Sequence, residues 1–118
     1  MLSNPIWIEV DCKGEDTKKP YVGKFCVKPF LTVREKTEVS RIYGKYTIGL
    51  PPSEDNALDS RFFLNTLAFF KVAIVESSCD WWTGDEPGMD LLDTQPIFDL
   101  LDKYTEAKRN LMPKEEAK

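Results

Sequence analysis

The stretch IWIEVDC, residues 6–12, decides the fold, because apolar and polar side chains alternate along it. The alternation has the period of a half-buried β-strand, and it places Trp7 on the polar side beside Glu9 and Asp11. After a polar segment, the stretch YVGKFCVKPF, residues 21–30, alternates in the same way. Together the two stretches predict an antiparallel β-hairpin. An isolated hairpin is marginal in water, so we expect helices to cover its apolar face.

The segment after the hairpin has the features of a helix start. Thr32 and Glu35 stand at the spacing of a capping box, in which each side chain satisfies a backbone amide of the other residue. Apolar residues then recur at intervals of three and four, which predicts a helix over about 33–47 that packs along one stripe. Tyr43 and Tyr46 belong to this stripe.

Two more helices are predicted further along the chain. Residues 55–77 include RFFLNTLAFFKVAIV, and a helix this apolar is either central to the fold or partly covered by another chain. Thr94 and Pro96 are expected to open the last helix, in which Asp99 and Lys103 have the i,i+4 spacing of a favourable ion pair. The sequence thus predicts an α+β fold, with an N-terminal antiparallel β-hairpin packed against about three α-helices.

The length of the chain, 118 residues, fits a single domain with one core. We expect this α+β domain to occupy residues 1–110, and residues 111–118 to form a polar tail that frays. The sequence shows no secretory leader pattern and no apolar run of the length that spans a bilayer. These features favour a cytoplasmic protein that does not bind membranes.

Charge and composition argue against several classes of function. The net charge of -4 at pH 7 opposes the phosphate neutralisation on which most nucleic-acid affinity depends. The sequence has no His, which is the commonest general base and a frequent metal ligand. We therefore expect a protein that is not an enzyme, needs no cofactor and does not bind nucleic acid.

The cysteines and the loop carboxylates were the remaining candidates for chemistry. Cys12, Cys26 and Cys79 form no CxxC pair, and the sequence has no His to activate a thiol, so reduced and inert thiols are expected. A metal site or a glycosidase-like acid pair is conceivable in the acidic loop, but the spacing matches no EF-hand. Solvated charges and helix caps such as Asp93 are the favoured interpretation of Asp80, Asp85, Glu86, Asp90 and Asp93.

The most distinctive functional feature is the adjacent pair Trp81 and Trp82 in the acidic loop predicted at 78–93. Large aromatic rings in a connecting segment either pack back onto the core or await a partner. Adjacent residues of an extended segment point in opposite directions, so we expect one ring to lock the loop onto the core and the other to stay accessible as a hot spot. For the candidates outside this loop, Tyr43, Tyr46 and Phe69, packing in the core is the alternative role. The candidate partner-binding residues are Trp81, Trp82, Tyr43, Tyr46 and Phe69.

Short motifs follow one another in a fixed order between residues 20 and 105. They comprise Tyr21, Gly23, Phe25, Val27 and Lys28, then Leu31 and Thr32, then Trp81 and Trp82, and finally Gly88, Asp90, Leu91 and Asp93. This order resembles a group of small tailed-bacteriophage proteins, the tail assembly chaperones. In that group a Y-x-G-x-F-x-V-K segment precedes a helix with a leading Leu-Thr, and a W-W or F-W pair precedes G-x-D-L-x-D. Cys79 departs from the pattern, because the group tends to have Pro two residues before the aromatic pair.

The resemblance implies a non-enzymatic assembly factor of the host cytoplasm. Such a factor binds the long, aggregation-prone tape measure protein and helps tail tube subunits to polymerise on it. Exposed apolar surface, offset by net acidic charge, suits that role, and self-association of the chain remains open. Two alternatives are a virion structural protein of the tail or head-neck region and an acidic inhibitor of a host protein. The inhibitor predicts a continuous acidic face.

Overall fold

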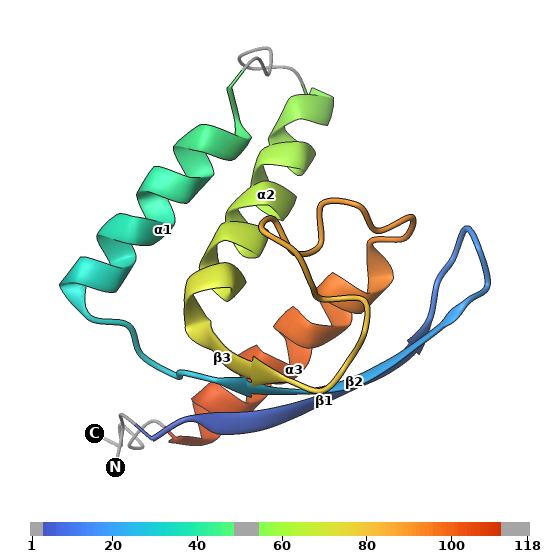
Figure 1. The fold of residues 1–118 in the computed structure, drawn as a ribbon, viewed down its shortest axis with the longest axis horizontal. Coiled ribbons are helices and arrows are strands. Elements are labelled where there is room, and N and C mark those ends of the chain that lie inside the picture. Colours follow the sequence, from blue (N-terminus) through green and yellow to red (C-terminus); the bar gives the residue numbers. More distant parts are fainter. Residues whose placement is uncertain (1–3, 49–54, 112–118) are drawn as a thin grey trace, which may run out of the picture.

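The computed structural model describes residues 4–48 and 55–111, and it describes the side chains of these ranges except for 55–60. Within them a three-stranded sheet carries helices on one side (Figure 1). The α+β prediction is confirmed. The elements are β1 (Ile6–Lys13), β2 (Pro20–Val27), α1 (Val33–Tyr46), α2 (Asp55–Ala73), β3 (Ile74–Ser77) and α3 (Gln95–Leu111). The predicted tail at 111–118 lies outside the described residues, apart from Leu111 at the end of α3.

The predicted hairpin is formed by β1 and β2, which pair antiparallel without a break from Ile6 opposite Val27 to Lys13 opposite Pro20. Apolar and polar side chains that alternate in the sequence lie on opposite faces of the sheet. Ile8 and Val10 are buried under the helices, whereas the side chain of Trp7 is 58% exposed on the outer face.

The prediction of a helix over residues 55–77 is wrong in its last turn. The helix ends at Ala73, and residues 74–77 form β3, which adds to the free side of β2 with a register shift between Cys26 and Val27. The amide of Lys28 donates to the carbonyl of Ala73 at 2.9 Å, which takes an acceptor that a continuing helix would use. Pairing with β2 and the β-branched residues at the start of β3 outweigh the helical pattern, because sheet pairing is a long-range contact that periodicity does not report.

Helix α1 begins where the capping box predicts. The amide of Thr32 donates to Glu35 Oε1 at 2.8 Å, and the amide of Glu35 donates to Thr32 Oγ1 at 3.1 Å. Glu35 also pairs with Lys28, and these bonds hold the pKa of Glu35 below its ordinary value, the Lys28 bond most of all. The helix ends one residue earlier than predicted.

Helix α3 closes the outer edge of β1. Asp99 and Lys103 form the predicted i,i+4 ion pair, with Nζ and Oδ2 separated by 3.1 Å. Lys103 Nζ also donates to the carbonyl of Glu9 at 3.0 Å, and the amide of Asp11 donates to Asp99 Oδ2 at 3.4 Å. Side chains thus occupy backbone groups that an unpaired edge strand would offer to another chain.

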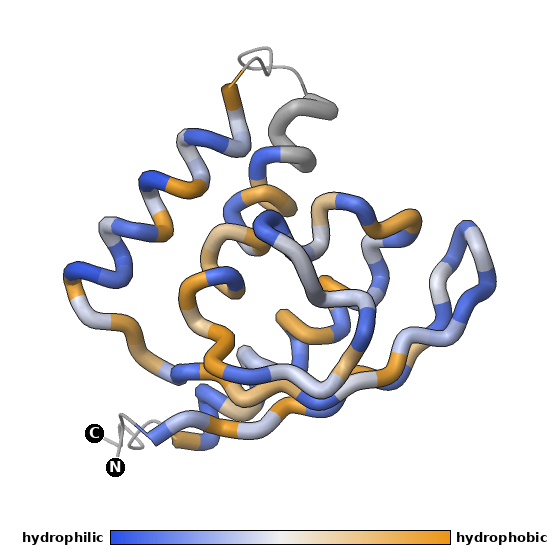
Figure 2. The backbone as a smooth tube through the Cα atoms, viewed as in Figure 1, coloured by the Kyte–Doolittle hydropathy of each residue, from blue (hydrophilic) through white to orange (hydrophobic). Residues whose placement is uncertain are grey.

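The core lies where α2, α3 and the inner face of the sheet meet. Figure 2 shows apolar segments gathered there and hydrophilic segments at the tip of the hairpin and along α1. Helix α2 is central, as one of the two readings of its apolar sequence predicts. Helix α2 and its neighbours α3 and β2 supply fully buried side chains of the core, which include Phe25, Leu67, Phe70, Ile97 and Leu100.

Candidate functional site

The tryptophan loop, residues 78–94, runs from β3 to α3 and turns both indole rings towards β2. Trp82 is 7% exposed and meets the ring of Phe25 edge-on, with centroids 6.2 Å apart. Trp81 is partly buried and meets Tyr21 at 5.6 Å and Phe25 at 5.3 Å, while its Nε1 donates to the carbonyl of Val22 at 3.3 Å. Trp82 therefore locks the loop onto the core. The expected opposite directions are not seen, because the chain bends through these residues instead of being extended.

The loop then passes back over Trp82 through Gly88. This residue has a φ of +88°, and a Cβ there would lie 2.6 Å from Leu67 Cδ2 and 3.1 Å from Trp82 Cζ3. Glycine both permits the left-handed backbone and leaves room for the close approach. Trp82 is enclosed by the core on one side and by its own loop on the other, so a partner has no direct access to it.

Asp93 is not the cap of α3, which corrects the prediction. Its carboxylate is 2% exposed and faces the tip of the hairpin. It accepts the amides of Asp16 at 2.8 Å and Thr17 at 3.2 Å, the Thr17 hydroxyl at 2.5 Å, and the Tyr21 hydroxyl at 2.9 Å. The amides of Ile97 and Phe98 donate to the backbone carbonyl of Thr94, the residue before α3. One side chain thus joins the end of the tryptophan loop to the β1–β2 turn.

These hydrogen bonds shift the pKa values of both Asp93 and Tyr21. Donation by Thr17, followed by that of Asp16 and Tyr21, holds the pKa of Asp93 below its ordinary value. Burial, and then the bond to the Asp93 carboxylate, raise the pKa of Tyr21. Gly14 makes the contact possible, since a Cβ at this position would lie 2.2 Å from Asp93 Oδ2.

Successive inward-facing residues of β2 contact the tryptophan loop. Tyr21 holds Asp93, Phe25 contacts both indole rings, and between them Gly23 faces Cys79, whose Cβ would lie 2.4 Å from a Cβ on the glycine. Residues of the first and the last of the motifs quoted from the sequence therefore pack against each other. In this structure they seat the loop on the sheet.

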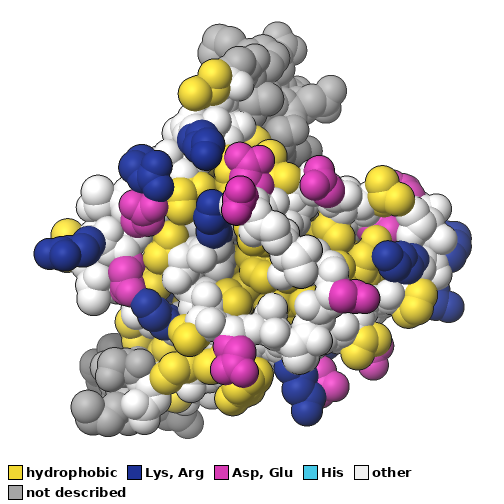
Figure 3. All heavy atoms as spheres, viewed as in Figure 1, with side chains coloured by type: hydrophobic (Ala, Val, Ile, Leu, Met, Phe, Trp, Pro, Cys, Tyr) yellow, Lys and Arg dark blue, Asp and Glu magenta, His cyan; other side chains and the backbone are white. Residues whose placement is uncertain are grey.

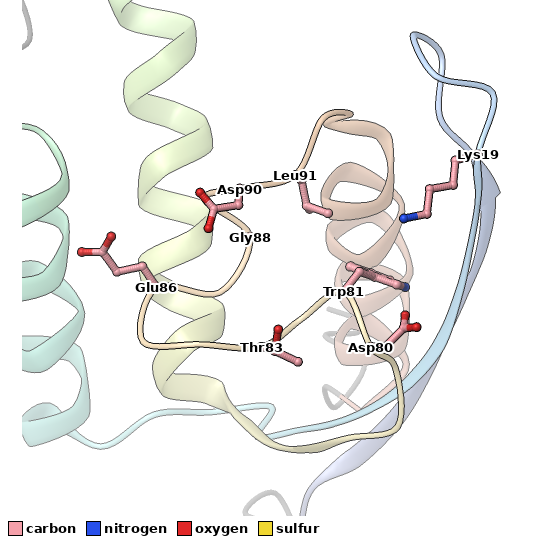
Figure 4. Close-up of a pocket in the computed structure, with 8 residues that line it drawn as sticks. All are labelled: Lys19, Asp80, Trp81, Thr83, Glu86, Gly88, Asp90 and Leu91. Atoms are coloured by element: carbon pink, nitrogen blue, oxygen red, sulfur yellow. The ribbon is translucent and has the colours of Figure 1, made fainter.

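A polar pocket of about 290 Å³ lies beside Trp81 (Figure 4). Lys19 lines it from the hairpin, and Asp80, Glu86 and Asp90 line it from the loop. Figure 4 shows the carboxylates of Asp80 and Asp90 at different ends of the pocket, pointing away from each other. General acid and base chemistry on a glycoside needs two carboxylates that face one another across the scissile bond. Asp80 and Asp90 are not placed as such a pair.

Tyr43 and Tyr46 face inward from α1. Tyr46 is 9% exposed, and burial, followed by the charge of Glu86, raises its pKa. Its hydroxyl has no hydrogen-bond partner among the residues that the structure describes. Tyr43 is partly buried against the same core. Neither ring presents an exposed face of the kind expected of a hot spot.

Phe69 is partly buried and packs against Phe70 at 5.3 Å and Tyr104 at 5.5 Å, measured between ring centroids. It also lines a groove of about 170 Å³ where α1, α2, α3 and the β2–α1 connection meet. The lining residues are Pro29, Phe30, Leu31, Lys36, Val39, Phe69 and Lys108.

The most exposed aromatic contact was missed by reasoning from the sequence. Phe62 of α2 is 53% exposed, and it stacks on Phe98 of α3, which is 36% exposed, with an interplanar angle of 7° and centroids 6.2 Å apart. Phe63 adds a third ring, 5.7 Å from Phe98. We call these three residues the aromatic seam. A signal existed, because Phe98 lies outside the apolar stripe of α3 that begins with Ile97.

Charges of both signs are mixed over the surface. On the face shown in Figure 3, Lys and Arg side chains alternate with Asp and Glu side chains around apolar atoms. This face therefore lacks the continuous acidic surface that an inhibitor mimicking nucleic acid would need.

The cysteines are free thiols, and Cys26 is buried. Burial raises the pKa of both Cys12 and Cys79, which lowers their thiolate fraction and their reactivity. Among the side chains that the structure describes, those of residues 4–48 and 61–111, no group of three or more Cys, Asp or Glu could hold a metal ion. In the same part of the chain, no helix has both the length and the apolarity needed to cross a membrane.

Comparisons of the chain with protein-family models, with curated proteins and with solved structures found no match.

Proposed function

We propose that this protein is a non-enzymatic phage tail assembly chaperone that binds the tape measure protein and assists assembly of the tail tube. The observation that carries the binding role is the aromatic seam, where Phe62 and Phe98 stack with much of their surface open to solvent. The identity of the client is supported by the ordered motifs of the sequence. The two lines of support are independent and can fail separately.

The aromatic seam has the physical character of a binding surface. Removing apolar area from water contributes about 25 cal/mol per Å², and aromatic rings at interfaces are frequent hot spots. Phe62 and Phe98 come from different helices, and their contact leaves a surface broader than a single ring. An apolar strip of this kind suits an amphipathic helix, which presents anchors at i, i+3, i+4 and i+7.

The rest of the molecule supports a carrier role. A net charge of -4 keeps a protein with exposed aromatic rings soluble, and the mixed charges of Figure 3 limit non-specific attraction to either sign. A client rich in apolar helix would cover the seam and have its own aggregation-prone surface covered in return.

The test is co-expression of the protein with the tape measure protein of the same genome. We expect the wild-type chain to co-purify with the client and to raise its soluble fraction. The double variant Phe62→Ala and Phe98→Ala should lose both effects. Trp7→Ala is the matched control, because Trp7 is a comparably exposed aromatic residue, 58% exposed, on the outer face of the sheet. This variant should retain both effects.

Three outcomes would contradict the proposal or a part of it. If the wild-type chain neither co-purifies with the tape measure protein nor improves its solubility, the chaperone role is wrong. If mass spectrometry detects the chain in purified particles, a virion structural role is favoured instead. Retained binding in the double seam variant, with binding lost in the Trp7 control, would move the client surface to the sheet.

A further inference from the structure

We infer a second binding site, distinct from the aromatic seam. The groove lined by Phe69 accepts one large apolar anchor residue from an acidic peptide segment of a partner protein. Neither Phe62 nor Phe98 lines this groove. The inference does not depend on the tape measure protein being the client.

The size of the groove fits a single side chain. Its volume is about 170 Å³, and an apolar protein cavity of about 150 Å³ is known to accept benzene. The walls are apolar and come from several elements, with Phe30, Leu31, Val39 and Phe69 all partly exposed. An aromatic or long aliphatic anchor would bury its surface here and exchange contact with water for contact with these walls.

The charges at the groove are complementary to an acidic partner. Lys36 and Lys108 line it, and neither forms an ion pair with any residue that the structure describes. The nearby Lys28 differs, since Glu35 already neutralises it. Two basic residues without acidic partners flank an apolar groove, although the whole chain has a net charge of -4. This local reversal of sign selects carboxylates placed beside the anchor.

The groove is held in shape before any partner arrives. The hydroxyl of Tyr104 donates to the carbonyls of Pro29 at 2.9 Å and Lys28 at 3.2 Å, which fastens the β2–α1 connection to α3. The capping box at Thr32 fixes the other end of this connection. Lys108 Nζ lies 4.9 Å from the centroid of Phe30 and is thereby positioned at the rim. Preorganisation of this kind lowers the entropy lost on binding.

The test uses fluorescein-labelled peptides and the full chain. The probe is a short peptide with a central Phe flanked by Glu and Asp, and its binding is followed by fluorescence anisotropy. One control peptide has Ala in place of Phe, and another has Lys in place of every acidic residue. We expect the affinity of the Ala peptide to be lower by a factor of about ten or more, because this peptide lacks the anchor. The Lys peptide should show no saturable binding.

Variants of the protein locate the site. Lys36→Glu combined with Lys108→Glu should weaken the probe about tenfold, since two attractive contacts become repulsive. Lys24→Glu, an exposed lysine of the outer sheet face, is the matched control and should leave affinity unchanged. Val39→Glu places a carboxylate in the groove from a partly exposed position and should also weaken the probe. NMR chemical shifts should change around Leu31, Lys36 and Phe69.

Four results would overturn the inference. The first is the absence of saturable binding for probes anchored by Phe, Leu or Trp. The second is equal affinity for wild type and the double lysine variant. The third is displacement of the probe by vesicles of anionic lipid, which would assign the groove to a membrane surface. The fourth is a concentration-dependent dimer that Val39→Glu abolishes, which would assign it to a second copy of this chain.

Discussion

The tryptophan loop and the aromatic seam are both clusters of large rings, but they differ in what covers them. The loop carries two adjacent indoles, and both are drawn onto Phe25. In the seam, Phe62 and Phe98 meet across two helices and remain 53% and 36% exposed. Neighbouring aromatic residues in a loop are therefore poor evidence of an exposed surface, and a lone aromatic residue off the apolar stripe of a helix is better evidence.

The difference arises from what holds each region. The loop is fixed from three directions, by the Asp93 carboxylate, by the close approach at Gly88 and by the contact of Gly23 with Cys79. Among the described residues, the ring contacts of the seam are those among its own three phenylalanines, and Phe62 and Phe98 remain 53% and 36% exposed. The binding role therefore moves from the tryptophans to the phenylalanines in our proposal.

The largest effect is expected for Trp82→Ala. The side chain is 7% exposed, so its removal leaves a cavity and should lower the free energy of unfolding by about 3–5 kcal/mol. Urea unfolding followed by circular dichroism measures the change. Trp7→Ala, at an exposed site, should change stability by about 0.5 kcal/mol or less. Equal losses in the two variants would show that Trp82 is not a core residue.

A smaller loss is expected for Gly23→Ala. The new Cβ would meet Cys79 Cβ at 2.4 Å, and because this neighbour is part of a fixed loop, the loop must shift. Overpacking of this kind costs about 1–3 kcal/mol. Gly44→Ala is the matched control, because nothing lies within 4 Å of a Cβ there and α1 gains a better helix former. Thermal unfolding should rank Gly44→Ala above wild type and Gly23→Ala below it.

Asp93→Asn should change how stability depends on pH. The control variant is Asp102→Asn, at an exposed carboxylate of α3, and it should change this dependence less. The folded pKa of Asp93 lies below the ordinary value of about 3.9. Its stabilisation is therefore complete above about pH 4 and is lost as pH falls through the folded pKa, because the unfolded chain binds the proton first. The variant should be less stable than wild type at neutral pH, by less than Trp82→Ala, with a shallower loss in acid. An unchanged acid slope would contradict a role for this carboxylate.

A change in stability smaller than that of Trp82→Ala is expected at the aromatic seam, because its rings are more exposed. Phe98→Ala removes a ring that is 36% exposed, together with its contacts to Phe62 and Phe63, and each aromatic pair contributes about 0.5–1.5 kcal/mol beyond the burial of the ring. Phe98→Ala should nevertheless weaken binding of the client more than Trp82→Ala does. The comparison is made at low temperature, where the Trp82→Ala protein is still folded. Pull-down of the client by both purified variants measures this difference. The comparison fails if Phe98→Ala binds as well as wild type.

Local patterns predicted much of the fold. Alternation placed the faces of β1 and β2 correctly, the Thr32 and Glu35 spacing placed the start of α1, and the Asp99 and Lys103 spacing found an ion pair. Each of these depends on neighbours within a few residues or on a period, which is information that the sequence carries directly. The third strand escaped prediction, because residues 74–77 pair with β2, which is a long-range contact that a local pattern does not report.

The candidate site was less predictable, for a related reason. Burial of a loop side chain depends on where the loop returns, and that is decided by distant contacts. The burial of Trp82 requires the φ of +88° at Gly88 and the inward face of β2. The role of Asp93 requires the amides of Asp16 and Thr17, which lie far away in the sequence. No period or cap signal contains these pairings.

The sequence by itself determined the α+β class, the hairpin and its faces, and the helix starts. These follow from local propensity, periodicity and the chemistry of the residue types, which act over a few residues. Only the tertiary structure decided which aromatic rings face solvent, that Asp93 joins the loop to the hairpin tip, and that Lys36 and Lys108 flank one apolar groove. Those outcomes depend on segments far apart in the chain meeting in space, where packing and hydrogen bonding select one arrangement.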